Sequence, residues 1–155
     1  MELEEAGNDS EKIKKHLDKV EFEQTRKIDF DEHMQVRTTP KRRKIMLNER
    51  WVPYESVKAE DQGNGVVRRV LAYSKDLMCV ENTFEKGAVG ALHHHPHTQI
   101  TYVVSGVFEF EIEGEKRVVK AGDTMLKTDS VEHGCVCLEA GVLLDIFNPM
   151  RDDFV

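Results

Sequence analysis

The chain has 155 residues, of which 39% are hydrophobic and 33% charged, and its formal net charge is −7 at pH 7. This length suits one domain and is too short for two independent hydrophobic cores. The acidic net charge disfavours nucleic acid as a partner. The sequence contains no run of about 18 apolar residues that would predict a membrane span. Its polar N-terminus lacks a secretory signal pattern, so we expect a cytoplasmic protein.

Residues 1–45 differ in composition from the rest of the chain. They hold eleven Lys or Arg and eleven Asp or Glu, so the whole net charge lies in residues 46–155. Ser10 can cap a short helix, and apolar residues at period two over 28–36 indicate a strand or extended arm. We therefore expect 1–45 to be a charged N-terminal extension or linker and 46–155 to be the single domain. A chain that begins at Met46 is the alternative.

From about Trp51 onward, short strand-like runs alternate with turn residues, and no amphipathic helix is evident. The clearest run is VFEFEIE (107–113), in which apolar and acidic residues alternate, so one face is expected in a core and the other in water. Turn residues at 105–106 and 140–141 divide further runs at a spacing typical of an antiparallel sandwich or barrel. The sequence thus predicts an all-β, jelly-roll type barrel. The predicted strands are residues 66–73, 77–84, 99–104, 107–113, 116–119, 124–127, 134–138 and 142–147.

Four histidines lie within five residues in the middle of the chain, where they lead into a predicted strand. In a strand, side chains two apart share a face, so His93, His95, His97 and Gln99 can project to the same side. His133 follows a Gly-Asp turn further along. This clustering predicts a metal site that keeps positions open for water or substrate. Imidazoles with one amide oxygen accept Ni, Zn, Mn, Fe or Co, so a divalent metal ion is the expected cofactor.

Two motifs in these segments resemble those of the cupin family. The spacing of Gly87, His93, His95, Gln99 and Gly106 resembles the first cupin motif, with glutamine where most cupins have glutamate. The run VKAGDTMLKTDSVEH resembles the second motif, which ends on a histidine ligand. The resemblance implies a single-domain cupin, a double-stranded β-helix or jelly-roll barrel, over about 46–155.

The cupin resemblance also implies the metal ligands, which are His93, His95, Gln99 and His133. Two positions depart from the second motif. Lys120 stands where proline is usual, and Cys137 stands where asparagine is frequent. Both positions shape a turn or the barrel wall, so they leave the implied ligands in place.

Two narrower features, HxHPHxQ and the C-terminal DIFNPMRDDFV, resemble small pectin degradation proteins of the KdgF type. Such enzymes open 4,5-unsaturated uronate rings, released by pectin or alginate lyases, into linear keto sugars. The resemblance places Asp145, Phe147 and Arg151 in the active site and implies a small anionic sugar as the substrate.

The residues themselves are compatible with these roles. Asp145 interrupts an apolar strand in phase with Leu143 and Phe147, so it is a candidate buried acid or base. Arg151 can offer a two-pronged donor to a carboxylate. An uncharged amide ligand leaves the full charge of the metal to attract an anion. Without the resemblance, a turn aspartate and a solvated tail arginine are the alternatives.

Other polar residues near the motifs have less definite expectations. His97 lines the cup or turns outward, with neither side favoured, whereas His94 is expected to be exposed. Tyr102 is out of phase with Gln99, so packing is its expected role. Either Arg68 or Arg69 could face the cup and bind an anion, but a solvated surface arginine is the favoured interpretation of each.

Two other functions fit the same motifs. One is an Fe(II)-dependent cupin dioxygenase, and the other is a non-catalytic sugar-binding or regulatory module, because the fold alone assigns no reaction. No nucleic-acid or membrane partner is expected. By analogy with small cupins we expect a homodimer, in which residues 25–38 supply an exchanged strand.

Overall fold

The computed structural model describes residues 41–155, so the helix, extended arm and exchanged strand expected before residue 41 lie outside the described residues. The described part is almost entirely β-structure, and none of its helices is long and apolar enough to cross a membrane. Its elements in chain order are the 3₁₀-helix η1 (Tyr54–Ser56), β1 (Glu60–Gly63), β2 (Val66–Tyr73), β3 (Met78–Phe84), β4 (Val89–His93), β5 (Thr98–Ile112), β6 (Glu115–Lys120), β7 (Thr124–Lys127), β8 (His133–Asn148) and the 3₁₀-helix η2 (Asp152–Phe154).

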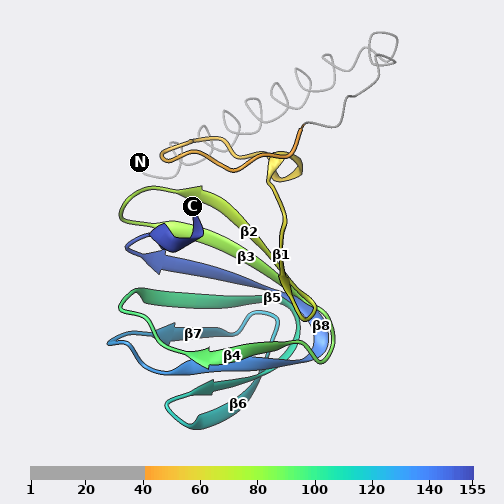
Figure 1. Ribbon diagram of the computed structural model, residues 1–155. Coiled ribbons are helices and arrows are strands. Elements are labelled where there is room, and N and C mark those ends of the chain that lie inside the picture. The colour runs from red at the N-terminus through yellow and green to blue at the C-terminus, as the bar shows by residue number, and fades with distance from the viewer. Residues whose placement is uncertain (1–40) are drawn as a thin grey trace, which may run out of the picture. The chain divides into compact units, whose positions relative to one another are not determined.

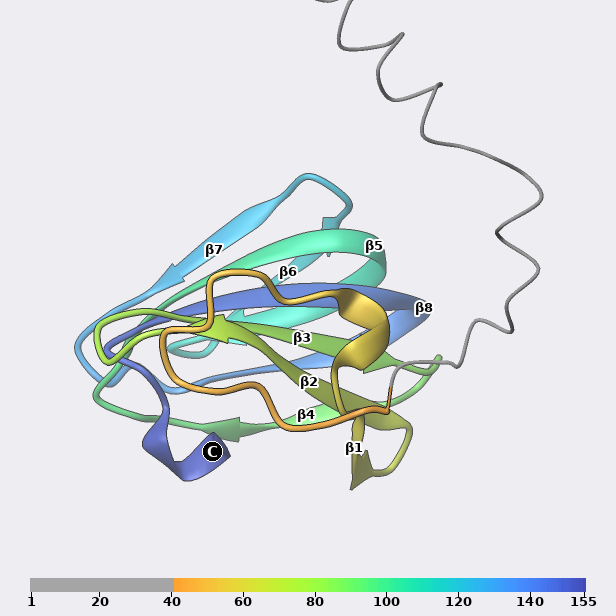
Figure 2. The same ribbon diagram turned by 90° about the horizontal axis from the view of Figure 1, so that it is seen from above.

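The strands form one antiparallel sheet that bends back on itself. Its main path runs β1-β2-β3-β8-β5-β6, while β4 pairs with β8 and β7 pairs with β5. Figure 1 shows β5 and β8 curving around one end of the domain, so that the two parts of the sheet face each other. One part holds β1, β2, β3 and β7 with one half of β5 and of β8, and the other part holds β4 and β6 with the remaining halves. Figure 2 shows the domain from above, with β7 and β5 toward one side and β2 and β3 toward the other. This is the all-β barrel predicted from the sequence.

The two longest strands correct the predicted turns at 105–106 and 140–141. Instead of ending there, β5 and β8 continue as strands of 15 and 16 residues. Their pairing slips between Val103 and Phe108, which marks β-bulges. Gly106 has a φ of +84°, and a Cβ there would lie 2.6 Å from the carbonyl oxygen of Glu139. The turn-forming residues therefore bend a continuous strand, which is how bulges and glycines curve a barrel wall.

Side chains alternate between the barrel interior and the outside, as predicted for VFEFEIE. Phe108 and Phe110 are buried, whereas Glu109 and Glu111 are only half-buried. Phe108 packs edge-to-face on Phe84 with ring centroids 5.5 Å apart. Two strands were not predicted, β1 and β4. Both are short and largely exposed, so they lack the apolar alternation on which the prediction rested.

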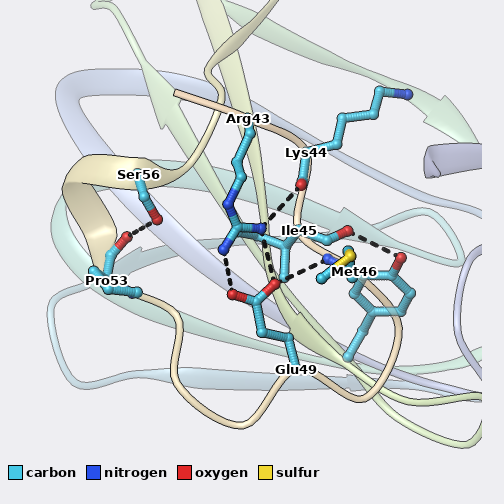
Figure 3. A network of polar contacts seen from close by, with 8 residues as sticks. Arg43, Lys44, Ile45, Met46, Glu49, Pro53 and Ser56 are labelled. Atoms are coloured by element: carbon cyan, nitrogen blue, oxygen red, sulfur yellow. Dashed lines mark hydrogen bonds and ion pairs between the residues drawn. The ribbon is translucent and has the colours of Figure 1, made fainter. Parts of the chain in front are cut away.

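Residues just before the barrel are tied to it by polar contacts, drawn in Figure 3. The Arg43 guanidinium forms a two-pronged ion pair with Glu49, and this hydrogen bond holds the pKa of Glu49 down at about 2. Ile45 is buried, and its carbonyl oxygen accepts a 3.1 Å hydrogen bond from the Tyr73 hydroxyl. Arg43 also forms a parallel β-bridge with Val57. The domain boundary at residue 46 stays a prediction.

Candidate metal centre and active site

Three histidines from two distant segments converge, of which His95 and His133 are buried and His93 is exposed. His93 ends β4, His133 begins β8, and the two residues are register partners. His95 lies in the loop between β4 and β5, so the cluster does not continue as the strand assumed from the sequence. One ring nitrogen from each histidine lies within 4.8 Å of the others, an arrangement that could hold a metal ion.

Backbone contacts fix how two of these imidazoles present their nitrogens. Nδ1 of His93 lies 2.8 Å from the carbonyl oxygen of Ala91, and Nδ1 of His133 lies 2.9 Å from that of Val131. A carbonyl oxygen is satisfied only by an N–H, so both rings carry their proton on Nδ1 and present the Nε2 lone pair. Such outer hydrogen bonds orient histidine ligands in metal sites.

Gln99 completes the group with its side-chain oxygen. Oε1 of Gln99 lies 2.9 Å from Nε2 of His95 and 3.2 Å from Nε2 of His133. With its proton on Nδ1, His133 faces the Gln99 oxygen as a second acceptor, and a metal cation between the two would satisfy both. Burial lowers the pKa of His133 to about 4, so a proton does not fill this role at neutral pH. The donor set of three imidazoles and one amide oxygen fits a divalent metal ion.

A buried polar network fixes the orientation of the Gln99 amide. Its nitrogen donates to Oδ1 of Asp145 at 2.7 Å and to the Thr101 hydroxyl at 3.2 Å. Thr101 in turn donates to Asp145 and accepts from the Lys127 ammonium. Asn82 donates to Oδ2 of Asp145 at 2.8 Å. An ionised carboxylate has about four acceptor positions. Three are used here, which leaves one on Oδ2.

His93, Gln99, His133, Asn82 and Asp145 border a cavity of about 360 Å³ that opens between the two parts of the sheet. The volume is at the small end of the range for ligand sites, roughly 300–1,000 Å³. Its lining combines apolar side chains with charged and polar ones, as expected for a site that binds a small polar molecule. Its lining includes Arg68, Asn82, Phe84, His93, Gln99, Phe110, His133, Leu143, Asp145, Phe147, Arg151 and Phe154.

Asp145, Phe147 and Arg151 all line this cavity. Asp145 and Phe147 are buried on the inner face of β8, in the phase expected from the sequence. The Phe147 ring packs edge-to-face against His95, with centroids 5.7 Å apart. Arg151 follows β8, and its Nε and Nη2 donate to the Asp153 carboxylate at 2.9 and 2.8 Å. Its two-pronged edge is thus engaged within the chain itself.

The remaining candidates from the sequence divide between the two faces of the barrel. His94 is exposed, as predicted, and His97 is half-buried with its ring 5.4 Å from that of His95. Tyr102 is 43% exposed on the outside of the barrel. The prediction that it packs against other side chains is therefore wrong for the part of the chain that the structure describes. Arg69 points away from the cavity and pairs with Glu81. Arg68 lines the cavity, against the favoured expectation.

The prediction missed Asn82, Thr101 and Lys127. Thr101 is in phase with Gln99 along a predicted strand, so period two alone could have placed it on the inner face. Lys127 is 1% exposed, and burial lowers its pKa to about 8. A lysine at the end of the apolar run TMLK has no sequence signal that distinguishes it from a solvated strand end. Its burial depends on the pairing of β7 with β5.

Comparison with known proteins identifies relatives of this chain. The family model described as cupin domain matches residues 80–147. The pectin degradation protein KdgF of Dickeya dadantii (strain 3937) is 48% identical over 98 residues, which cover 62% of this chain and 89% of that protein.

Two solved structures resemble the described domain closely. An RmlC-like cupin from Shewanella frigidimarina has a TM-score of 0.69 and 40% identity, covering 72% of this chain and 100% of that chain. KdgF from Halomonas sp. has a TM-score of 0.65 and 40% identity, covering 68% of this chain and 97% of that chain. The chain therefore belongs to the cupin superfamily and, within it, to the family of the pectin degradation protein KdgF.

Proposed function

We propose that this protein is a metal-dependent enzyme that opens the ring of 4,5-unsaturated uronates, which are released from pectin or alginate, to give linear keto sugars. One observation carries the proposal. Asp145 adjoins the cluster of His93, His95, His133 and Gln99 in a cavity that also holds arginines, in a chain 48% identical to KdgF of Dickeya dadantii. The name of that relative supports a role in pectin degradation.

The reaction is an isomerisation and needs no oxidant. The anomeric hydroxyl loses its proton as the C1 carbonyl forms, and the bond between C1 and the ring oxygen breaks. The ring oxygen becomes the C5 carbonyl, and C4 gains a proton. The chain must therefore accept a proton from one oxygen, deliver one to carbon, and hold the carboxylate.

Asp145 is placed for the proton transfer. Its Oδ2 has one acceptor position left beside the Asn82 hydrogen bond, and the carboxylate lines the cavity. A positioned carboxylate of this kind contributes about 10²–10⁴-fold to a rate. Phe147 provides an apolar wall against which a sugar ring can pack. A divalent ion held by His93, His95, His133 and Gln99 would act as a Lewis acid toward sugar oxygens.

The test is to add 4,5-unsaturated galacturonate and follow the loss of its conjugated ultraviolet absorbance. The metal-loaded protein should accelerate the decay, and Asp145→Ala should abolish the acceleration. Asp76→Asn, an exposed aspartate in the β2–β3 turn, is the matched control and should keep full activity. Failure of the wild-type protein to accelerate the decay would remove the proposal. Oxygen uptake dependent on iron would favour a dioxygenase, and sugar binding without turnover would favour a binding module.

The homodimer and the cytoplasmic location expected from the sequence stay predictions. Sedimentation velocity of the full chain tests the first. A single species with the mass of one chain would contradict it.

A further inference from the structure

Within residues 41–155, Arg68 lacks the kind of ion pair that Arg43, Arg69 and Arg151 form. It lies on β2 opposite Asn82, the residue that donates to Asp145. Its guanidinium carbon lies 3.8 Å from the ring centroid of Phe154, at the cavity wall. Among residues 41–155 it forms neither a hydrogen bond nor an ion pair, and its Nε is buried without a partner. A buried donor without an acceptor costs free energy, so this arrangement favours a bound acceptor.

Arg151 presents the opposite case. Its guanidinium also lies over Phe154, 4.3 Å from the ring centroid, but the edge formed by Nε and Nη2 is engaged by Asp153. Burial, and next the charge of Arg151, lower the pKa of Arg68. Asp153, Asp145 and Glu60 act in the opposite direction, yet none of them pairs with Arg68. Two cations thus border the cavity, and Arg68 has no counter-ion paired with it within residues 41–155.

From this geometry we infer that Arg68 binds the carboxylate of the substrate, while Asp153 holds Arg151 in place beside it. Asn82 of β3 links the two ends of the site, since it pairs with Arg68 on β2 and donates to Asp145 on β8. Adjacent strands are about 4.8 Å apart, so the backbones of β2 and β8 are separated by roughly 10 Å. Arg68 and Asp145 line the same cavity of about 360 Å³, which has room for one sugar ring. The identity of the anion as a uronate rests on the proposed function.

The inference makes Arg68 a determinant of specificity for charged sugars. A guanidinium holds a carboxylate through two charge-assisted hydrogen bonds, which a neutral ester cannot match. Arg69 is the matched control, because it neighbours Arg68 on β2 but pairs with Glu81 at 3.3 Å and lies over Tyr54, away from the cavity. The two substitutions therefore remove the same charge from opposite faces of one strand.

The experiment compares Arg68→Gln and Arg69→Gln with 4,5-unsaturated galacturonate and its uncharged methyl ester. Arg68→Gln should raise the KM for the acid by about 10- to 100-fold with little change in kcat, and should leave the ester unaffected. Arg69→Gln should change neither substrate. Circular dichroism and thermal melting check that both variants fold. An unchanged KM for the acid in Arg68→Gln, with active wild-type enzyme, would overturn the inference and leave the proposed function intact.

A second measurement keeps the two proposals separate. Titration calorimetry of the metal-loaded protein with D-galacturonate reports binding without turnover, and D-galactose is the neutral control. If the wild-type protein lacks ring-opening activity, the proposed function fails, but tenfold weaker galacturonate binding in Arg68→Gln alone still supports an anion site at Arg68. Equal binding by both variants, or no binding by the wild type, would refute it.

Discussion

The side-chain amide of Gln99 donates a 2.7 Å hydrogen bond to Asp145, and its oxygen therefore faces His95 and His133. An ionised carboxylate only accepts hydrogen bonds, so Asp145 determines which end of the amide reaches the histidines. The proposed catalytic acid or base and the proposed metal ligand are thus one connected unit. Glutamine, rather than the glutamate of most cupins, is what allows a carboxylate to lie beside this position.

The first prediction concerns the hydrogen bond that the Gln99 side-chain amide donates to Asp145. Gln99→Glu should bring two carboxylates together and remove the hydrogen bond, so that kcat/KM falls by about 10- to 100-fold although a carboxylate can still bind metal. Elemental analysis and the ultraviolet assay measure the two effects separately. Adding Asp145→Asn places an amide donor at position 145 beside the carboxylate acceptor at position 99, which restores one hydrogen bond between the two side chains. The double variant should therefore recover thermal stability yet stay inactive. Full activity of Gln99→Glu would show that the hydrogen bond is dispensable.

The second prediction concerns the metal. Adding a divalent ion to chelator-treated protein should raise its melting temperature, because a ligand at 1,000 times its Kd stabilises the native state by about 4 kcal/mol. His95→Ala should lose most of this rise, since the residue is one of the converging three. His94→Ala is the control, because it removes an exposed imidazole from the same run of histidines. An equal rise in both variants would place the ion elsewhere.

The sequence predicted the fold through two regularities that need no tertiary information. Alternation identified the inner face of β5 and β8, including Phe108 and Asp145, because side chains of a strand point to opposite faces. Turn residues were harder to interpret. Gly106 has the conformation of a turn, but the chain around it remains paired across a bulge. Whether such a residue reverses or merely bends a strand depends on the partner strand, which local sequence does not specify.

The candidate site was predictable where its residues cluster in sequence. His93, His95 and Gln99 lie within one short segment, so their spacing predicted that they lie close together, and the resemblance to the second cupin motif added His133. Their role as metal ligands stays a prediction. Lys127 and Arg68 were not predictable in this way. The burial of Lys127 depends on the pairing of β7 with β5, and the position of Arg68 at the cavity depends on the pairing of β2 with β3. An arginine on a strand has the same local signal whether it faces solvent or a ligand site.

The third prediction tests the bend in β5. Gly106→Ala places a Cβ 2.6 Å from two backbone atoms of the Glu139–Gly141 segment, so it should lower the free energy of unfolding by more than about 3 kcal/mol. Gly114→Ala has nearly the same φ, +79°, but open space around the Cβ, so its cost should be about 1–2 kcal/mol. Urea denaturation measures both. Equal losses of stability would mean that the backbone conformation alone, and not the close approach of β8, requires glycine at position 106.

The fourth prediction uses the ion pair in Figure 3. The folded-state pKa of Glu49 is about 2, below its ordinary value of 4.5, mainly because Arg43 donates to it. A depressed carboxyl pKa contributes stability above the unfolded value, and this contribution is lost as the pH falls through the folded value. Glu49→Gln should therefore be less stable than wild type at pH 7, and the difference should shrink below about pH 4.5. A difference that is constant from pH 7 to pH 3 would contradict the assignment.

The last prediction separates stability from function at Lys127. Burial lowers the pKa of Lys127 to about 8, so the interior penalises its ammonium, while the charge of Asp145 opposes this penalty. Lys127→Met removes both effects, so the free energy of unfolding should change by less than about 3 kcal/mol. Turnover should nevertheless fall at least about tenfold, because the Thr101–Asp145 network loses its cation. Lys120→Met, at the exposed end of β6, should change stability by less than about 0.5 kcal/mol and leave turnover unchanged. Urea denaturation and the ultraviolet assay give the two readings. A variant that loses stability but keeps its turnover would assign Lys127 to the fold rather than to the site.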